Sequence, residues 1–265
     1  MPTPTKSSSP QNNYFLIQRK GGHGSSFFGF QMNAWAVHFK NPVPYQAGLD
    51  LQHRILKARQ EERIPDTVLL LQHTPVVTLG NRGRDNYLLK TAAEYAELGI
   101  DLFHVERGGD VTYHGPGQWV LYPILHLGGN EADSHGYLSN LEEIAIQTLA
   151  DFGVEGFRKE GKSGAWTTAG KIAAIGFRLK RWVSFHGMSF NVSLDLSGFQ
   201  TIVPCGLVGE PVASLKTILG DTTPSMKAVH QSLLHHFSTI CKRSLDIFDA
   251  DGEMPAELAQ LFDRK

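Results

Sequence analysis

Cysteine is scarce in this sequence, because only Cys205 and Cys241 occur among 265 residues. Two cysteines are far too few for a disulfide framework in a chain of this size, which favours a reducing compartment. No apolar run approaches the ~18 residues that a membrane span needs, and no N-terminal stretch has the pattern of a signal peptide. These absences predict a cytoplasmic protein with no membrane partner.

The net charge of the chain is also small. The formal net charge is -1, so no overall basic field points to nucleic acid as a partner. Asp and Glu are absent from Met1 to Leu49, and the first twelve residues are rich in Pro, Ser and Thr. An acid-poor start is one feature of mitochondrial transit peptides, but these are also rich in arginine, and here Arg19 stands alone. A mitochondrial protein is therefore the less favoured alternative, and residues 1–30 are expected to be a flexible extension.

Helix-like and strand-like patterns alternate along the rest of the chain. Apolar residues at helical spacing predict helices over 45–62, 137–152 and 224–240, with Gly153 as a C-terminal cap. Short β-rich runs predict strands at Thr67–Leu71, Val76–Leu79, Val111–His114 and Trp119–Leu125. Lys171–Leu179 and Trp182–Val192 are expected to form an antiparallel hairpin with a tight turn near Lys180–Arg181.

The order of these elements lacks a regular βαβ repeat. It therefore predicts an α/β (α+β) fold, in which helices flank a mixed β-sheet. No internal repeat or linker interrupts the chain between residues 30 and 250. A single catalytic domain is expected over residues 31–250, followed by a C-terminal tail over residues 251–265.

A glycine-rich run, Arg107–Gln118, is the first of three segments with chemical potential. Gly108 and Gly109 let the backbone approach a ligand closely, and Arg107 and His114 offer hydrogen-bond donors nearby. The spacing is not that of a phosphate-binding loop. Taken alone, the run could equally be a turn that leads into a strand.

Lys171 is the centre of the second segment. It lies between Gly170 and small apolar residues at the start of a strand that is expected to be half buried. Most lysines are solvated, so this setting is unusual. Burial lowers the pKa of a lysine and a nearby thiolate raises it. In either case Lys171 could carry a proton or pair with a charge.

Cys205 dominates the third segment. It lies between Pro204 and Gly206, a setting more typical of a loop, where a thiol can be exposed and reactive. The alternative is a small buried hydrophobic residue, and this is the role expected for Cys241 at the end of a helix. His235 and His236 are adjacent on a predicted helix and cannot chelate together, so no metal site is expected.

All three segments together resemble one family. The runs RGGDVTYHGPGQWVLYP, GKIAAIGFRLKRWVSFHGMSFNV and DLSGFQTIVPCGL are similar to the three sequence blocks of the lipoyl(octanoyl) transferases. The resemblance implies a fold related to the biotin/lipoate protein ligases, an acyl tunnel, and catalytic roles for Cys205 and Lys171. By position it also implies substrate-binding roles for Arg107, Gly108, Gly109, Asp110, Val111, Thr112, Tyr113, His114, Ala174, Ile175, Gly176, Gly187, Met188 and Ser189.

The activity implied by the resemblance is octanoyl transfer. The donor would be octanoyl-acyl carrier protein, which brings its own phosphopantetheine, so the enzyme would need no cofactor. The acceptors would be lysines on the lipoyl domains of 2-oxoacid dehydrogenase E2 subunits and on the glycine cleavage H protein. Residues 164–167 depart from the family pattern, since Thr167 stands where relatives often have an apolar residue.

The implied mechanism is consistent with the chemistry of the residues. The ammonium group of Lys171 would lower the pKa of Cys205 and favour the thiolate that attacks the donor. Backbone N–H groups near Gly206 or His186 could hold the oxyanion. The small residues Ala174, Gly176 and Gly187 would leave room for an acyl chain, or would pack the hairpin tightly.

Two other functions remain open at this point. An ATP-dependent lipoate or biotin ligase could use the same scaffold, but it would not need Cys205. A non-catalytic protein that binds lipoyl domains would need neither Cys205 nor Lys171.

Overall fold

The central element is a mixed sheet of eight strands in the computed structural model, which describes residues 32–203 and 210–262. The strand pairs at one end, β11–β1 and β1–β2, are parallel, and every later pair is antiparallel. The predicted extension, residues 1–30, and Cys205 lie outside the described residues. The strand order is β11 (Arg243–Asp249), β1 (Met32–His38), β2 (Asp66–Leu71), β6 (Gln118–Ile124), β10 (Val183–Asn191), β9 (Gly170–Lys180), β8 (Lys162–Thr167) and β7 (Phe157–Lys159).

A second sheet of three strands holds the glycine-rich run. Its order is β4 (Asp101–His104), β3 (Val76–Leu79) and β5 (Val111–His114), with β3 parallel to β4 and antiparallel to β5. The short helix α2 (Ala92–Glu97) comes before β4 in the chain. Short segments of 3-10 helix complete this region and the connections elsewhere, at Asp85–Tyr87, Gly129–Glu131, Leu196–Thr201 and Gly220–Thr222.

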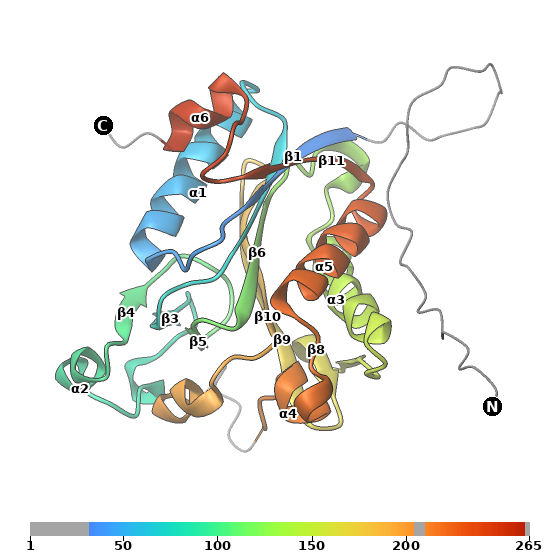
Figure 1. Ribbon diagram of the computed structural model, residues 1–265. Helices are drawn as coiled ribbons and strands as arrows, with labels where there is room; N and C mark the ends of the chain where they lie inside the picture. The colour runs from blue at the N-terminus through green and yellow to red at the C-terminus, as the bar shows by residue number, and fades with distance from the viewer. Residues whose placement is uncertain (1–31, 204–209, 263–265) are drawn as a thin grey trace, which may run out of the picture. The chain divides into compact units, whose positions relative to one another are not determined.

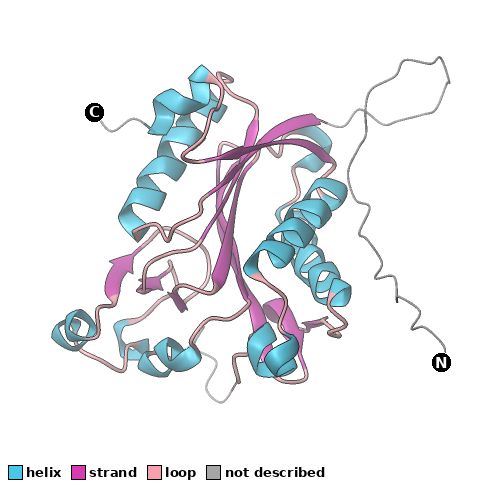
Figure 2. Cartoon of the chain, viewed as in Figure 1, coloured by secondary structure: helices cyan, strands magenta, loops and turns pink. Residues whose placement is uncertain are grey.

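Helices cover both faces of the large sheet (Figures 1 and 2). On one face, α3 (Ser134–Asp151) and α5 (Met226–Ile240) bury their apolar sides against the sheet, and the short helix α4 (Leu215–Leu219) contributes Leu215 to the same core. On the other face, α1 (Tyr45–Gln60) packs with α6 (Ala256–Phe262). The predicted fold class, a mixed sheet with flanking helices, is therefore confirmed.

Most of the predicted elements lie where the hydrophobic patterns placed them. The three long helices begin and end within three residues of the predicted bounds. Gly153 follows α3 with a φ of 71°, the left-handed conformation expected of a C-terminal cap. The predicted hairpin is β9–β10, and its two turn residues, Arg181 and Trp182, both have positive φ. That pair of positive φ angles matches the twist of the two strands.

The end of the chain contributes to the core. The sequence predicts a C-terminal tail over residues 251–265, and within that segment α6 packs against α1. Leu258 is fully buried there and Leu261 nearly so, in the same cluster as Leu51 and Ile55. None of the helices in the described ranges has both the length and the apolar content of a membrane span.

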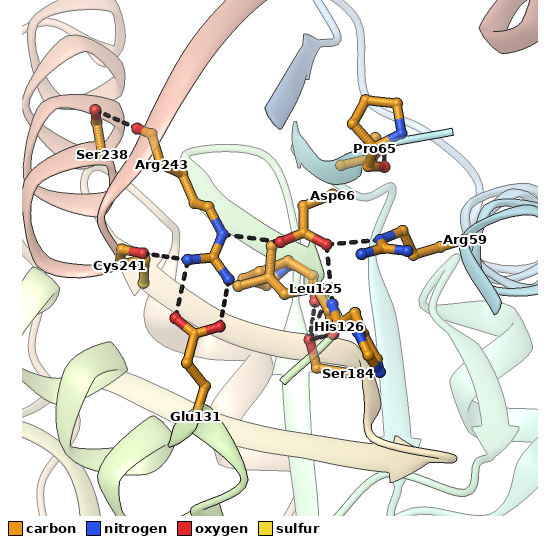
Figure 3. A network of polar contacts seen from close by, with 12 residues as sticks. Arg59, Pro65, Asp66, Leu125, His126, Glu131, Ser184, Ser238, Cys241 and Arg243 are labelled. Atoms are coloured by element: carbon orange, nitrogen blue, oxygen red, sulfur yellow. Dashed lines mark hydrogen bonds and ion pairs between the residues drawn. The ribbon is translucent and has the colours of Figure 1, made fainter. Parts of the chain in front are cut away.

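Buried charges connect β2 to β11 across the intervening strand β1 (Figure 3). The Asp66 carboxylate accepts hydrogen bonds from Nε of Arg59 at 2.7 Å and from Nε of Arg243 at 2.8 Å. Both terminal nitrogens of Arg243 also donate to the Glu131 carboxylate, at 3.0 and 2.8 Å. The side chains of Asp66 and Arg243 are only 3% and 2% exposed, so each neutralises the other where water cannot.

Candidate active site

A cavity of about 260 Å³ lies between the β9–β10 hairpin, β6 and the glycine-rich run. It opens to solvent beside Arg82 and Gly161, which are exposed, and it is closed by buried residues such as Tyr45, Tyr122 and His186. Most of the residues that the resemblance singled out line this cavity together with Lys171. These are Arg107, Gly109, Asp110, Thr112, His114, Ala174, Ile175, Gly176, Gly187, Met188 and Ser189.

Three of the expected substrate residues do not line the cavity. Successive side chains of a strand point to opposite faces, so Val111 and Tyr113 of β5 point away from Thr112 and His114. They pack instead in the small core of the second sheet. Gly108 lies against β9, where its N–H donates to the Phe177 carbonyl at 3.0 Å. Their contribution to the site is to hold the glycine-rich run in place.

Lys171 lies at the start of β9, directly beside Trp166 of β8. Its ammonium nitrogen is 5.4 Å from the centroid of the Trp166 ring, a distance at which a cation is attracted to the ring face. The aliphatic part of the side chain crosses Gly164, where a Cβ atom would come within 2.7 Å of Lys171 Cε. The stricter requirement for glycine at position 164 comes from its φ of 111° and from the Ala173 carbonyl oxygen, with which a Cβ atom would collide.

The backbone of Lys171 pairs with the residues that follow the Cys205 segment. Its N–H donates to the Pro211 carbonyl at 2.8 Å, and its carbonyl accepts from the Ala213 N–H at 2.9 Å. Gly170 permits this approach, because a Cβ atom there would collide with the Pro211 carbonyl. The segment around Pro211 and Ala213 is thereby fixed against the strand that carries Lys171.

A chain of hydrogen bonds sets the protonation of His114. Asn191 donates its side-chain N–H to the Ala213 carbonyl at 2.9 Å, so its side-chain oxygen accepts from the Gln118 amide at 2.8 Å. The remaining Gln118 oxygen must accept from Nδ1–H of His114, at 2.7 Å. Nε2 of His114 therefore carries no proton and can only accept a hydrogen bond.

His73 and Tyr122 form a second polar contact at the closed end of the cavity. Nδ1–H of His73 donates to the Val43 carbonyl at 2.8 Å, which leaves Nε2 to accept from the Tyr122 hydroxyl at 2.7 Å. Burial lowers the pKa of His73 to about 4 and the pKa of both His114 and His186 to about 3. All three histidines are consequently neutral near pH 7.

These buried histidines predict a loss of stability in acid. Their folded-state pKa values lie below the ordinary 6.5, so the unfolded chain binds protons more tightly. Their contribution is complete above pH 6.5 and is lost as the pH falls toward 3 to 4, by up to about 1.4 kcal/mol per pH unit for each histidine. Unfolding free energies measured between about pH 7.5 and 5 are expected to fall less steeply in His73→Gln than in the parent protein.

The control for this measurement is His104→Gln, because the side chain of His104 is 69% exposed. That variant should keep the parental slope. Equal slopes in all three proteins would show that His73 takes up no extra proton on unfolding.

The glycines of the hairpin have a packing role. A Cβ atom at Gly176 would lie 2.5 Å from the Gly108 carbonyl oxygen, and one at Gly187 would collide with the Leu121 carbonyl. Both residues border the cavity, but the close approach of neighbouring backbone is what excludes a side chain. The tight-packing alternative thus accounts for Gly176 and Gly187, and Ala174 remains as a small residue that faces the cavity.

Two other expectations concern groups near the site. The backbone N–H of His186 was a candidate for holding an oxyanion, but it already donates to Oε1 of Gln52 at 2.8 Å. Gly206, the other candidate, lies outside the described residues.

Cys241 is buried as predicted, and burial raises the pKa of its thiol to about 12. Within residues 32–203 and 210–262, no group of three or more His, Cys, Asp or Glu side chains could hold a metal ion.

Comparison with known proteins defines the class. The family model of the lipoyl protein ligase A/B catalytic domain matches residues 44–238. A structure of lipoate-protein ligase A bound with ATP superposes with a TM-score of 0.70 over 88% of this chain and 93% of that one, at 14% identity. A bipartite lipoate protein ligase from Thermoplasma acidophilum gives a TM-score of 0.69 over 87% and 91%, also at 14% identity. At this identity the superpositions establish the fold, which is that of a lipoyl ligase catalytic domain.

The curated relatives are more specific. The chain is 44% identical to an octanoyltransferase of Syntrophotalea carbinolica, over 77% of this chain and 93% of that protein. It is 42% identical to an octanoyltransferase of Caldicellulosiruptor bescii, over 80% and 93%. The chain belongs to the octanoyltransferase family, and it is an acyltransferase. The resemblance recognised in the three sequence blocks is confirmed.

Proposed function

We propose that this enzyme transfers an octanoyl group from an acyl carrier protein, through a thioester on Cys205, to a lysine of a lipoyl domain. The observation that carries the proposal is the pairing of the Lys171 backbone with Pro211 and Ala213. Cys205 precedes Pro211 by six residues, a length of chain that spans at most ~20 Å. No more than this length of chain separates Cys205 from the residues that pair with Lys171, and Lys171 lines the cavity.

The reaction is a pair of acyl exchanges. The Cys205 thiolate attacks the carbonyl carbon of the donor thioester, forms a new thioester, and releases the thiol of the donor's phosphopantetheine. The amine of the acceptor lysine then attacks the new thioester, which gives an amide and returns the Cys205 thiol. The first exchange is nearly isoenergetic and the second is downhill, so neither ATP nor a resident cofactor is required.

Lys171 would carry the protons in this scheme. Its ammonium group, held over the Trp166 ring, favours the thiolate of Cys205 and can protonate a leaving thiolate. The cavity histidines His114 and His186 have pKa values of about 3, too low for a general base near neutral pH. Nε2 of His114 can still accept a hydrogen bond from the attacking amine.

The proposed partners follow from the family. They are octanoyl-acyl carrier protein as donor, and the lipoyl domains of 2-oxoacid dehydrogenase E2 subunits and the glycine cleavage H protein as acceptors. The archaeal relative in the structural comparison is described together with its E2 lipoyl domain, which supports this class of acceptor. The proposed location is the cytoplasm.

The acyl-enzyme provides the direct test. Incubation with octanoyl-acyl carrier protein, without ATP or acceptor, is expected to add one octanoyl group to Cys205, and peptide mass spectrometry should locate it there. Cys241 is the internal control, because its buried thiol has a pKa of about 12 and should stay unmodified. Octanoylation of Cys241, or full turnover by Cys205→Ser, would contradict the mechanism. Transfer that requires ATP and free octanoate would indicate a ligase instead.

The glycine packing leads to a prediction about chain length. Gly176→Val is expected to lower activity toward four-, six- and eight-carbon donors by similar factors, because the new side chain displaces the Gly108 backbone. It should also destabilise the fold by about 1–3 kcal/mol through overpacking, seen as a lower Tm. Ala174→Val is the matched variant on the same strand, since Ala174 faces the cavity. It should reduce transfer of the longest chain most.

A selective loss of eight-carbon transfer in Gly176→Val, with an unchanged Tm, would contradict the packing explanation. It would mean that the Gly108 backbone yields easily and that the added side chain enters the space of the acyl chain.

A further inference from the structure

His186 occupies the closed end of the cavity in an unusual backbone conformation. Its φ is 54°, and its side chain is almost completely buried while lining the cavity. In the β9–β10 register it pairs with Phe177, the residue that follows the cavity-lining run Ala174–Gly176. Lys171 lies near the start of the same strand and also lines the cavity. An acyl chain that begins near Lys171 and follows β9 is therefore directed toward His186.

The imidazole ring of His186 packs against aromatic side chains and forms no hydrogen bond with a described residue. It stacks on Phe185, with centroids 4.8 Å apart at an interplanar angle of 30°, and meets Tyr122 edge-on at 6.3 Å. The Tyr122 hydroxyl is already committed to His73. Among the described residues, neither ring nitrogen of His186 has a hydrogen-bond partner.

This unsatisfied ring has a defined hydrogen-bonding capacity. Burial, followed by the nearby charge of Arg107, lowers the pKa of His186 to about 3, so the ring is neutral at physiological pH. A neutral imidazole has one N–H donor and one nitrogen acceptor, whichever tautomer it adopts. Buried polar groups are almost always paired, so an unpaired one that lines a cavity requires a partner that the described residues do not supply.

We propose that the His186 end of the cavity is a hydrogen-bonding subsite for a hydroxyl group at the far end of a medium-chain acyl group. A terminal hydroxyl both donates and accepts one hydrogen bond, and so it matches a neutral imidazole in either tautomer. A terminal carboxylate would fit poorly, because it would bring an extra charge into a buried place. The enzyme then accepts ω-hydroxyacyl donors as well as unsubstituted ones. This inference rests on the proposed acyl transfer.

Donor comparison in the parent enzyme tests the subsite. The values of kcat/KM are measured for octanoyl-, 8-hydroxyoctanoyl-, 10-hydroxydecanoyl- and 4-hydroxyoctanoyl-acyl carrier protein. For at least one of the two donors with a terminal hydroxyl, kcat/KM should stay within about threefold of the octanoyl value. The mid-chain hydroxyl should lower kcat/KM at least about tenfold, because that hydroxyl remains unpaired. Equal penalties for terminal and mid-chain hydroxyls would overturn the proposal.

Variants of His186 identify the partner of the hydroxyl. In His186→Phe, the ratio of ω-hydroxyacyl to octanoyl transfer should fall about tenfold, the effect of one lost hydrogen bond. His186→Asn keeps a polar group and tolerates positive φ, so it should retain more of that ratio. An unchanged ratio in His186→Phe would overturn the assignment, and if neither variant folds, the donor series in the parent enzyme decides.

A binding measurement separates this inference from the proposed function. Calorimetric titration of the parent protein with free 8-hydroxyoctanoic, 10-hydroxydecanoic, 4-hydroxyoctanoic and octanoic acids requires no transfer. A preference for the terminal over the mid-chain hydroxyl in binding, with no transfer from octanoyl-acyl carrier protein, would leave the subsite standing and remove the proposed donor reaction. Transfer of the octanoyl group without that preference in binding would support the proposed transfer and remove the subsite.

Discussion

Replacement of Lys171 by alanine is expected to lower kcat/KM for octanoyl transfer by about 10²–10⁴-fold, the usual effect of losing a general acid–base group. The loss has two parts, because the variant lacks both a cation beside the Cys205 thiolate and a carrier for the transferred proton. Steady-state kinetics with octanoyl-acyl carrier protein and a lipoyl domain provide the measurement. Lys162→Ala is the matched control, since Lys162 also lines the cavity and lies 6.0 Å from the same Trp166 ring. It should lose much less.

Thiol labelling isolates the electrostatic part of this effect. In Lys171→Ala, iodoacetamide should label Cys205 more slowly near pH 7, and the pH profile of labelling should shift upward, because the anion has lost a neighbouring cation. Lys171→Arg keeps the charge but exchanges protons poorly, so labelling should survive while turnover falls. Superimposable labelling profiles for the parent and Lys171→Ala would mean that Lys171 does not act on the thiol.

The largest stability effect is expected at Asp66. Asp66→Ala should lower the free energy of unfolding by about 3–5 kcal/mol, because it removes the buried acceptor of Arg59 and Arg243 and leaves Arg243 with incomplete neutralisation. Chemical denaturation measures this change. The control is Glu61→Ala, which breaks an ion pair with Arg63 in which both side chains are nearly half exposed. That variant should lose less than about 1 kcal/mol.

A change below about 1 kcal/mol in Asp66→Ala would show that the buried charges relax toward solvent when one partner is removed. In that case the network would contribute little to holding β11 on the sheet.

The sequence predicts the elements with a strong internal pattern. The helices α1, α3 and α5 and the β9–β10 hairpin have apolar residues at a regular period, and that period is a local property of the chain. The strands β1 and β11 were not predicted. Half of β11 is exposed, so it has little hydrophobic pattern, and it is stabilised by pairing with β1 across 211 positions. Pairing over such a distance leaves no local signal.

The residues of the site likewise divide into those that a local sequence pattern marks and those that it does not. Lys171, Ala174 and Gly187 line one cavity, because the hairpin that joins them is short, and the family resemblance marks these residues in the sequence. His73 and Tyr122 were missed, since each lies in a strand or loop of ordinary composition. Tyr122 lines the cavity from β6, and His73 is connected to the cavity through the Tyr122 hydroxyl. The imidazole of His186 could be located in the sequence, but its lack of polar partners could only be found in the folded chain.

The place of β11 at the edge of the large sheet has a consequence for synthesis on the ribosome. Among the strands of that sheet, β11 emerges last, and until it does β1 is an open edge with unpaired backbone groups. Arg243, the first residue of β11, then supplies the second cation for Asp66. A nascent chain interrupted before residue 243 therefore exposes a pairing surface and holds an under-neutralised carboxylate at the same time. Such fragments should aggregate, and their clearance would depend on chaperones and proteases.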